Sequence, residues 1–193
     1  MATIRAFIAI ELDELLRNGL MKVQQRLRSE PISGFVRWVA PNSVHLTLKF
    51  LGDMDAARTP LVLAAMQVAC ADFEPFELAV RGAGCFPNLQ RPNVIWAGLM
   101  GEVQVVAQLA QALEAECAKL KFEPEERPFS PHLTLGRVRR EAGLTERRQL
   151  GELVHRLDIG QVGLIHAQEV HLMRSELKPQ GSVYTSLGHV DLA

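Results

Sequence analysis

Hydrophobic positions recur along the chain with two spacings, one typical of helices and one typical of strands. Leu16, Leu20, Val23 and Leu27 are three or four residues apart, which is the spacing of one helix face. Asp13 can cap this helix at its start, and a proline follows its end. Pattern and composition together predict four helices, at 13–30, 55–72, 102–120 and 145–157, the last with Thr145 as its cap.

Short apolar runs rich in β-branched and aromatic residues predict the strands between these helices. The resulting order is β-α-β-β-α-β-β-α-β-α-β-β-β, without a low-complexity linker. This order favours an α+β fold of two similar lobes, each an antiparallel sheet with helices outside. A single domain over 1–193 is expected, whose lobes cannot be separated as contiguous segments. The predicted strands are 5–12, 35–39, 43–52, 76–88, 93–99, 131–138, 159–164, 167–174 and 182–189.

The tetrapeptide His-Leu-Thr-Leu occurs twice, at 45–48 and again at 132–135. None of the other four histidines is followed by threonine two residues later, so coincidence is a poor explanation. Side chains on a strand alternate between faces. Alternation therefore predicts that His45, Thr47 and Lys49 share one face and that His132 and Thr134 do the same, with the leucines opposite.

Two histidines that flank one reactive atom suit acid–base catalysis, because one imidazole accepts a proton while the other donates one. Hydroxyl groups suit phosphate oxygens, whose charge grows in the transition state. The alternative interpretation is that each histidine packs or caps its strand and each threonine is a good strand former. A zinc site is a weaker interpretation, since two histidines without a nearby carboxylate or cysteine form an incomplete ligand set.

The bulk composition narrows the classes of protein and of partner. The formal net charge is −1 over 193 residues, so we expect any nucleic-acid contact to be local rather than along a coated strand. No apolar run reaches 18 residues, and acidic residues interrupt the N-terminal apolar stretch, which predicts neither a membrane span nor a signal peptide. Three scattered cysteines favour neither a disulfide framework nor structural zinc. A cytoplasmic protein is expected.

With the paired motifs in view, the sequence resembles the 2H phosphoesterase superfamily, and within it the RNA 2′,3′-cyclic phosphodiesterases, also known as RNA 2′-5′ ligases. The resemblance covers "RAFIAIEL", "VRWVAPNSVHLTLKFLGD", "GAGCFPNLQRPNVIWAGL", "FSPHLTLGRV" and "VHLMRSELKPQGSVYTSL". It implies a two-lobed fold with the active-site cleft between the lobes. It also implies His45 as the proton donor, His132 as the proton acceptor, and Thr47 and Thr134 as phosphate-binding residues.

The two motifs already supply an acid, a base and hydroxyl donors, so we expect phosphoryl transfer without a metal or other cofactor, and we expect the protein to be a monomer. Its substrate would be RNA with a 2′,3′-cyclic phosphate end, such as tRNA fragments, or a cyclic nucleotide. A noncatalytic RNA-end binder and a phosphodiesterase for small non-RNA cyclic phosphates remain open as alternatives. Hydrolysis would leave a 2′-phosphate, and attack by an RNA 5′-hydroxyl would instead give a 2′-5′ bond.

Arg137 also corresponds to a family position near the phosphate, although strict alternation puts it on the leucine face of its strand. A bulge at Gly136 would reconcile the two. Phe7, Phe50 and Tyr184 are candidates for stacking on a base, with core packing as the alternative for the phenylalanines. The remaining histidines are interpreted as surface or structural residues: His155, His166, His171 and His189.

Overall fold

The computed structural model describes residues 2–178 and 181–193. Its helices and strands follow one another in the order predicted from the sequence. The helices are α1 (Glu14–Arg28), α2 (Thr59–Cys70), α3 (Val103–Lys119) and α4 (Leu144–Arg156). The strands are β1 (Thr3–Ile10), β2 (Val36–Trp38), β3 (Leu46–Asp55), β4 (Phe76–Phe86), β5 (Val94–Gly101), β6 (His132–Val138), β7 (Gln161–Ala167), β8 (Glu169–Lys178) and β9 (Gly181–Asp191).

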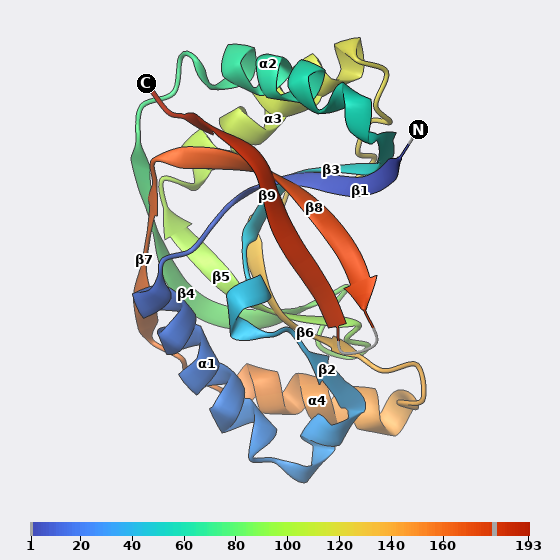
Figure 1. Ribbon diagram of the computed structural model, residues 1–193. Coiled ribbons are helices and arrows are strands. Elements are labelled where there is room, and N and C mark those ends of the chain that lie inside the picture. The colour runs from blue at the N-terminus through green and yellow to red at the C-terminus, as the bar shows by residue number, and fades with distance from the viewer. Residues whose placement is uncertain (1, 179–180) are drawn as a thin grey trace.

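The strands form two antiparallel half-sheets that meet in the middle of the molecule. Their order is β7-β4-β5-β6-β3-β1-β8-β9, and β2 pairs with β6 beside this path. The halves join where β6 pairs with β3, through the single Cα pair Leu46 and Leu133. Each half is one lobe, so the predicted two-lobed α+β fold is confirmed (Figure 1).

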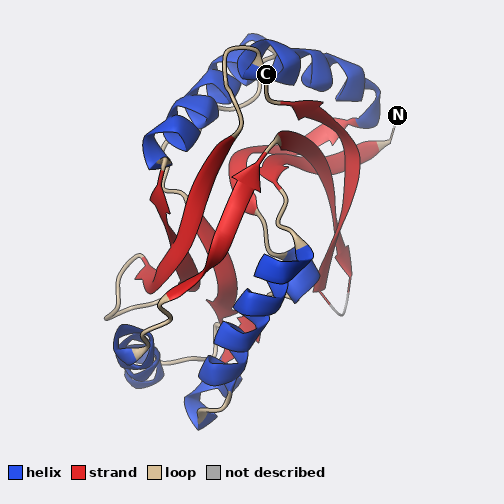
Figure 2. Ribbon diagram, turned by 90° about the vertical axis from the view of Figure 1, so that its left-hand side faces the viewer, coloured by secondary structure: helices blue, strands red, loops and turns tan. Residues whose placement is uncertain are grey.

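Two helices cover each lobe on its outer side, as the views in Figures 1 and 2 show. Helices α2 and α3 pack together over the β3-β1-β8-β9 half, and α1 and α4 contact β7 and β4 of the other half. Helix α1 follows β1 in the chain but covers the opposite lobe, and α3 crosses over in the same way after β5. Neither lobe is therefore a contiguous segment of the sequence.

The start of α1 follows the sequence prediction closely. Asp13 lies just before the helix, and its Oδ1 accepts a hydrogen bond from the amide of Leu16 at 2.7 Å. Leu16, Leu20, Val23 and Leu27 are buried, which confirms the predicted apolar face. Within the described ranges, no helix is both long and apolar enough to cross a membrane.

One local prediction is wrong, and one predicted strand is shorter than expected. Thr145 does not cap α4, because the helix already begins at Leu144, and Gly143 occupies the cap position without a side-chain hydrogen bond. The predicted strand at 35–39 does form, as the shorter β2, and it pairs with β6. A 3₁₀ turn over Pro41–Ser43 separates β2 from β3.

The predicted alternation along β3 also fails beyond Thr47. Ala9 pairs with Thr47 and Ile8 pairs with Lys49, so Leu48 is an extra residue that forms a β-bulge. The bulge reverses the faces of the residues that follow it. Lys49 is consequently buried at 3% exposure, where its ammonium group lies 2.8 Å from Glu114 of α3. It does not share the face of His45, as alternation predicted.

Strand β6 carries the same irregularity at the equivalent place. Trp96 pairs with Thr134 and Ile95 pairs with Gly136, which makes Leu135 the extra residue. The second leucine of each His-Leu-Thr-Leu motif is thus bulged. Residues two positions beyond each bulge, Phe50 and Arg137, return to the histidine face of their strands.

Candidate active site

His45 and His132 lie at the junction of the two lobes, beside the pair that joins β3 to β6. Leu46 pairs with Leu133, and in an antiparallel pair the flanking positions face each other. His45 therefore falls opposite Thr134, and His132 falls opposite Thr47. The two motifs bring their histidines and threonines onto one face, while both leucines are fully buried on the other.

The two imidazoles are held by the same backbone contact. Nδ1 of His45 lies 2.9 Å from the carbonyl oxygen of Ser43, and Nδ1 of His132 lies 2.7 Å from that of Ser130. A carbonyl oxygen only accepts, so each Nδ1 carries a proton and donates it. This bond fixes the tautomer and leaves each Nε2 free for proton transfer. The sequence carries no signal for this bond, because the acceptor is a backbone carbonyl, which every residue has.

Burial weakens the basicity of both rings. It lowers the pKa of His45 from 6.5 to about 4, against the opposing hydrogen bond to Ser43 and with smaller contributions from Arg137, Arg17 and His132. Burial also lowers the pKa of His132, with Arg137 acting in the same direction and the Ser130 bond opposing it. Both imidazoles are therefore mostly neutral at pH 7 when no anion is bound.

Arg137 reaches the site because of the bulge at Leu135. Its positive charge is among the smaller contributions that lower the pKa of both histidines. An arginine on the same face as two such imidazoles suits a phosphate, since its planar donors match the oxygens in geometry and charge. The bulge places Arg137 on the face of His132 and Thr134, so the strict alternation that put it on the leucine face is wrong.

Aromatic rings surround His45. Phe7 stacks on the imidazole with ring centroids 4.6 Å apart, and Tyr184 meets it edge-on at 5.0 Å. Phe7 is only 3% exposed and packs with Ala9 and Tyr184 in a small apolar cluster. Phe50 lies 6.3 Å from Phe7 and is 57% exposed. Phe7 therefore supports the imidazole, whereas Phe50 offers an exposed ring next to Phe7.

A second aromatic pair, which the sequence analysis did not single out, lies on the His132 side. Phe86 of β4 meets His132 edge-on at 4.8 Å, and Trp96 of β5 lies 5.2 Å from Phe86. Trp96 pairs with Thr134 across β5 and β6, and this pairing would have pointed to the aromatic pair. The register of the two strands is not visible in the sequence. Each catalytic candidate thus has aromatic contacts from its own lobe.

This arrangement can move protons on both sides of a bound phosphate. Two Nε2 atoms approach the site from two lobes, hydroxyl groups lie beside them, and an arginine supplies positive charge. In the described part of the chain, the one group of histidine and acidic side chains with metal-ligand spacing is Glu169, His189 and Asp191 on the β8–β9 hairpin. Neither His45 nor His132 belongs to that group.

Comparison with known families agrees with this class of site. The family model described as LigT like Phosphoesterase matches residues 10–96 and, separately, 99–184. These segments span most of the chain, and the chain belongs to the LigT-like phosphoesterase family.

Relatives and solved structures resemble the chain over nearly its whole length. An RNA 2′,3′-cyclic phosphodiesterase from Methanothermobacter thermautotrophicus is 38% identical over 95% of this chain and 96% of its own. An RNA 2′,3′-cyclic phosphodiesterase from Thermus thermophilus is 33% identical over 95% of this chain and 87% of its own. A crystal structure of the Thermus thermophilus protein TT0787 superposes with a TM-score of 0.79, 31% identity and 98% coverage of both chains. The crystal structure of E. coli LigT complexed with 3′-AMP superposes with a TM-score of 0.76, 25% sequence identity and 99% coverage of both chains.

Proposed function

We propose that this phosphoesterase hydrolyses RNA-terminal 2′,3′-cyclic phosphodiesters to 2′-phosphomonoesters, by two-histidine acid–base catalysis without a metal ion. The observation that carries the proposal is the matched placement of His45 and His132, each with Nδ1 bound to a backbone carbonyl and Nε2 free. The names of the relatives support the substrate class. The resemblance to their family supports the roles of the individual residues.

In the proposed reaction, the two histidines act on opposite sides of the phosphorus. In-line displacement puts the attacking water opposite the leaving oxygen. His132 accepts the proton of the water, and His45 donates a proton to the departing ribose 3′-oxygen. The new P–O bond comes from water, the P–O3′ bond breaks, and the phosphate stays on the 2′-oxygen.

Arg137 offsets the negative charge of the phosphate, and the hydroxyls of Thr47 and Thr134 donate hydrogen bonds to its oxygens. Arg137 lies on the histidine face of β6, and its charge contributes to the lowered pKa of both imidazoles, which supports a role in binding the phosphate. The exposed ring of Phe50 is the candidate platform for the terminal base, and Tyr184, edge-on to His45, is the second candidate. Phe7 contributes by packing under His45.

The same site has the chemistry for a second reaction. If the 5′-hydroxyl of another RNA replaces water as the nucleophile, the P–O3′ bond still breaks and a 2′-5′ linkage forms. His132 and His45 keep their roles. Ligation is therefore proposed as a secondary activity of this site, and a cytoplasmic monomer remains the expected form of the protein.

The test is a panel of substrates given to the purified protein. It contains an RNA oligonucleotide with a 2′,3′-cyclic phosphate end, a 2′,3′-cyclic nucleotide and ADP-ribose 1″,2″-cyclic phosphate. We expect the oligonucleotide to be opened fastest and its product to carry a 2′-phosphate. His45→Ala and His132→Ala should each slow turnover by about 100-fold or more, the size of one acid or base contribution. His155→Ala, on the outer helix α4, is the control.

Three outcomes would contradict the proposal. Binding of the oligonucleotide without product above background would indicate a noncatalytic RNA-end binder. Preference for ADP-ribose 1″,2″-cyclic phosphate would indicate a small-molecule phosphodiesterase. A 3′-phosphate product would mean that the ribose binds in the opposite orientation, with His45 next to the 2′-oxygen.

A further inference from the structure

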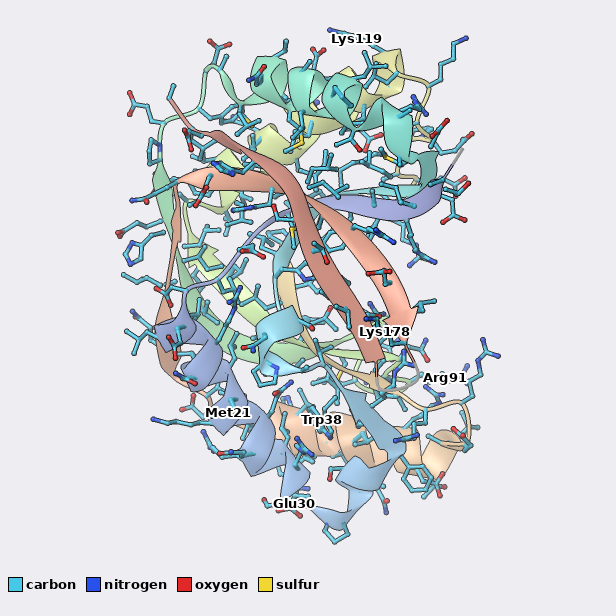
Figure 3. All side chains as sticks on the ribbon, viewed as in Figure 1. Met21, Glu30, Trp38, Arg91, Lys119 and Lys178 are labelled. Atoms are coloured by element: carbon cyan, nitrogen blue, oxygen red, sulfur yellow. The ribbon has the colours of Figure 1, made fainter. Side chains whose placement is uncertain are left out.

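A second cluster of ionisable side chains lies on the β8–β9 hairpin. Strand pairing puts Glu169 opposite Asp191 and His171 opposite His189, and alternation keeps these four residues on one face of the hairpin. We call them the hairpin cluster. They lie near the C-terminus, at the far end of the hairpin from Lys178 (Figures 1 and 3). From the sequence alone, both histidines of the cluster are interpreted as structural.

Distances within the hairpin cluster are close to those of metal ligands. Glu169 Oε2 lies 3.5 Å from His189 Nε2 and 3.8 Å from His171 Nε2. Ligand atoms of Glu169, His189 and Asp191 are all within 4.8 Å of one another. Around a tetrahedral zinc ion with bonds of 2.0–2.1 Å, neighbouring ligand atoms are about 3.3 Å apart. Small side-chain rotations would bring the cluster to that spacing.

His171 is also oriented as a metal-binding histidine would be. Its side chain is 12% exposed, and its Nδ1 lies 3.4 Å from the hydroxyl oxygen of Ser186. That hydroxyl in turn lies 3.4 Å from the carbonyl oxygen of Gly188. Metal-ligating histidines usually donate from the ring nitrogen that does not bind the metal, and this contact leaves the lone pair of Nε2 directed toward Glu169.

The hairpin cluster differs from an ordinary pair of one histidine and one carboxylate. Elsewhere in the chain His166 meets Glu77 at 2.7 Å, a simple pair of one imidazole and one carboxylate. In the hairpin cluster two imidazoles converge on one carboxylate, and the carboxylate of Asp191 lies close by. Two nearby carboxylates repel each other when both histidines are neutral. A bound cation removes that repulsion and uses the lone pairs of the imidazoles.

We propose that the hairpin cluster binds one divalent transition-metal ion, with Zn²⁺ as the best match. Mixed imidazole and carboxylate ligands favour zinc and its neighbours, whereas Mg²⁺ and Ca²⁺ prefer oxygen ligands alone. The ion clamps β8 to β9. It is separate from the catalytic side chains, because Thr47, Ala9 and His171 lie on three successive strands. Thr47 and His171 are therefore separated by two strand spacings, which is about 10 Å.

The experiment is a calorimetric Zn²⁺ titration of the full chain after treatment with EDTA, with the melting temperature followed in parallel. We expect one ion per chain and a higher melting temperature with zinc. Glu169→Gln and His189→Ala should each weaken binding about tenfold or more. His166→Ala is the matched control, since it removes a histidine from a simple ion pair. The Cys70, Cys85 and Cys117 thiols are buried, which raises their pKa to about 11, 12 and 11, so they do not compete.

A double variant, His45→Ala with His132→Ala, separates this site from the catalytic one. The hairpin cluster predicts that this variant still binds one zinc ion. Loss of binding in the double variant, with binding intact in His189→Ala, would place the ion at the catalytic histidines and overturn the proposal. So would wild-type protein that shows no saturable binding. Equal melting temperatures of all variants in EDTA would show that the substitutions left the fold intact.

Discussion

His45 and His132 have matching backbone contacts but lie in environments that suppress their charge. Burial lowers the pKa of His45 to about 4 and also lowers that of His132. A phosphate anion between the rings acts in the opposite direction, because a nearby negative charge favours the protonated form of a histidine. The proposed proton donor, His45, therefore acquires its proton when the substrate binds.

This coupling predicts two different pH profiles. The pH dependence of kcat/KM reports the free enzyme, so its bell should be centred on the acid side of the ordinary histidine pKa of 6.5. The kcat profile reports the complex, in which the phosphate raises the pKa of the pair, and its bell should lie at higher pH. Initial rates from pH 4 to 9 would measure both. Coincident bells, or a kcat/KM bell centred above pH 7, would contradict the prediction.

The roles of the two histidines can be separated with the leaving group. A substrate whose 3′ leaving group is more acidic needs less help from a proton donor. We expect such a substrate to restore turnover of His45→Ala much more than turnover of His132→Ala. Single-turnover rates of both variants with both substrates would measure the difference. Preferential rescue of His132→Ala would reverse the assignment of acid and base.

At the scale of elements, two β-bulges decide which side chains reach the site. Strand alternation correctly placed His45 with Thr47 and His132 with Thr134. It failed for Lys49 and Arg137, because a bulged leucine stands between these residues and the histidines. Bulges depend on the register of the neighbouring strand. That information lies in β1 and β5 and not in the motif.

The bulge in β6 is held from the opposite side by α1. Gln24 is 2% exposed, and its Nε2 donates to the carbonyl oxygens of Val39 and Leu135, both at 2.8 Å. We predict that Gln24→Met lowers the free energy of unfolding by about 1–3 kcal/mol, since both carbonyls lose a buried donor. The bulge orients Arg137, so KM should rise more than kcat falls.

Gln25→Met is the matched control for this prediction, because Gln25 is the next residue of α1 and points to solvent. Chemical denaturation and steady-state kinetics of both variants would provide the measurement. If Gln24→Met loses stability without any change in KM, the contact supports the fold but does not position Arg137. If both variants behave alike, the hydrogen bonds to the bulge carry little free energy.

At the scale of the whole molecule, the fold repeats one pattern about the β3–β6 pair. The two-lobed arrangement could be predicted from the duplicated tetrapeptide and the order of elements, because both are visible in local stretches of the sequence. The sequence could not predict that α1 and α3 each cover the opposite lobe, which depends on tertiary packing. The hairpin cluster was missed for a similar reason. Glu169 and His189 lie on two consecutive strands and meet only through the register in which β8 pairs with β9, which the sequence does not show.

The separation between the two sites leads to a prediction about metal removal. In the proposed reaction, two imidazoles at the lobe junction transfer the protons, Arg137 offsets the charge of the phosphate and two threonine hydroxyls donate hydrogen bonds to it, so no step is left for a metal ion. We therefore expect EDTA to leave kcat within about twofold of the untreated protein, well below the contribution of one acid or base. Zinc at the hairpin cluster should change the melting temperature instead. Rates and melting curves of one preparation, before and after chelation, measure both effects together. A loss of turnover that a divalent ion restores would show that the metal-free mechanism is wrong, because a chelator cannot remove an imidazole.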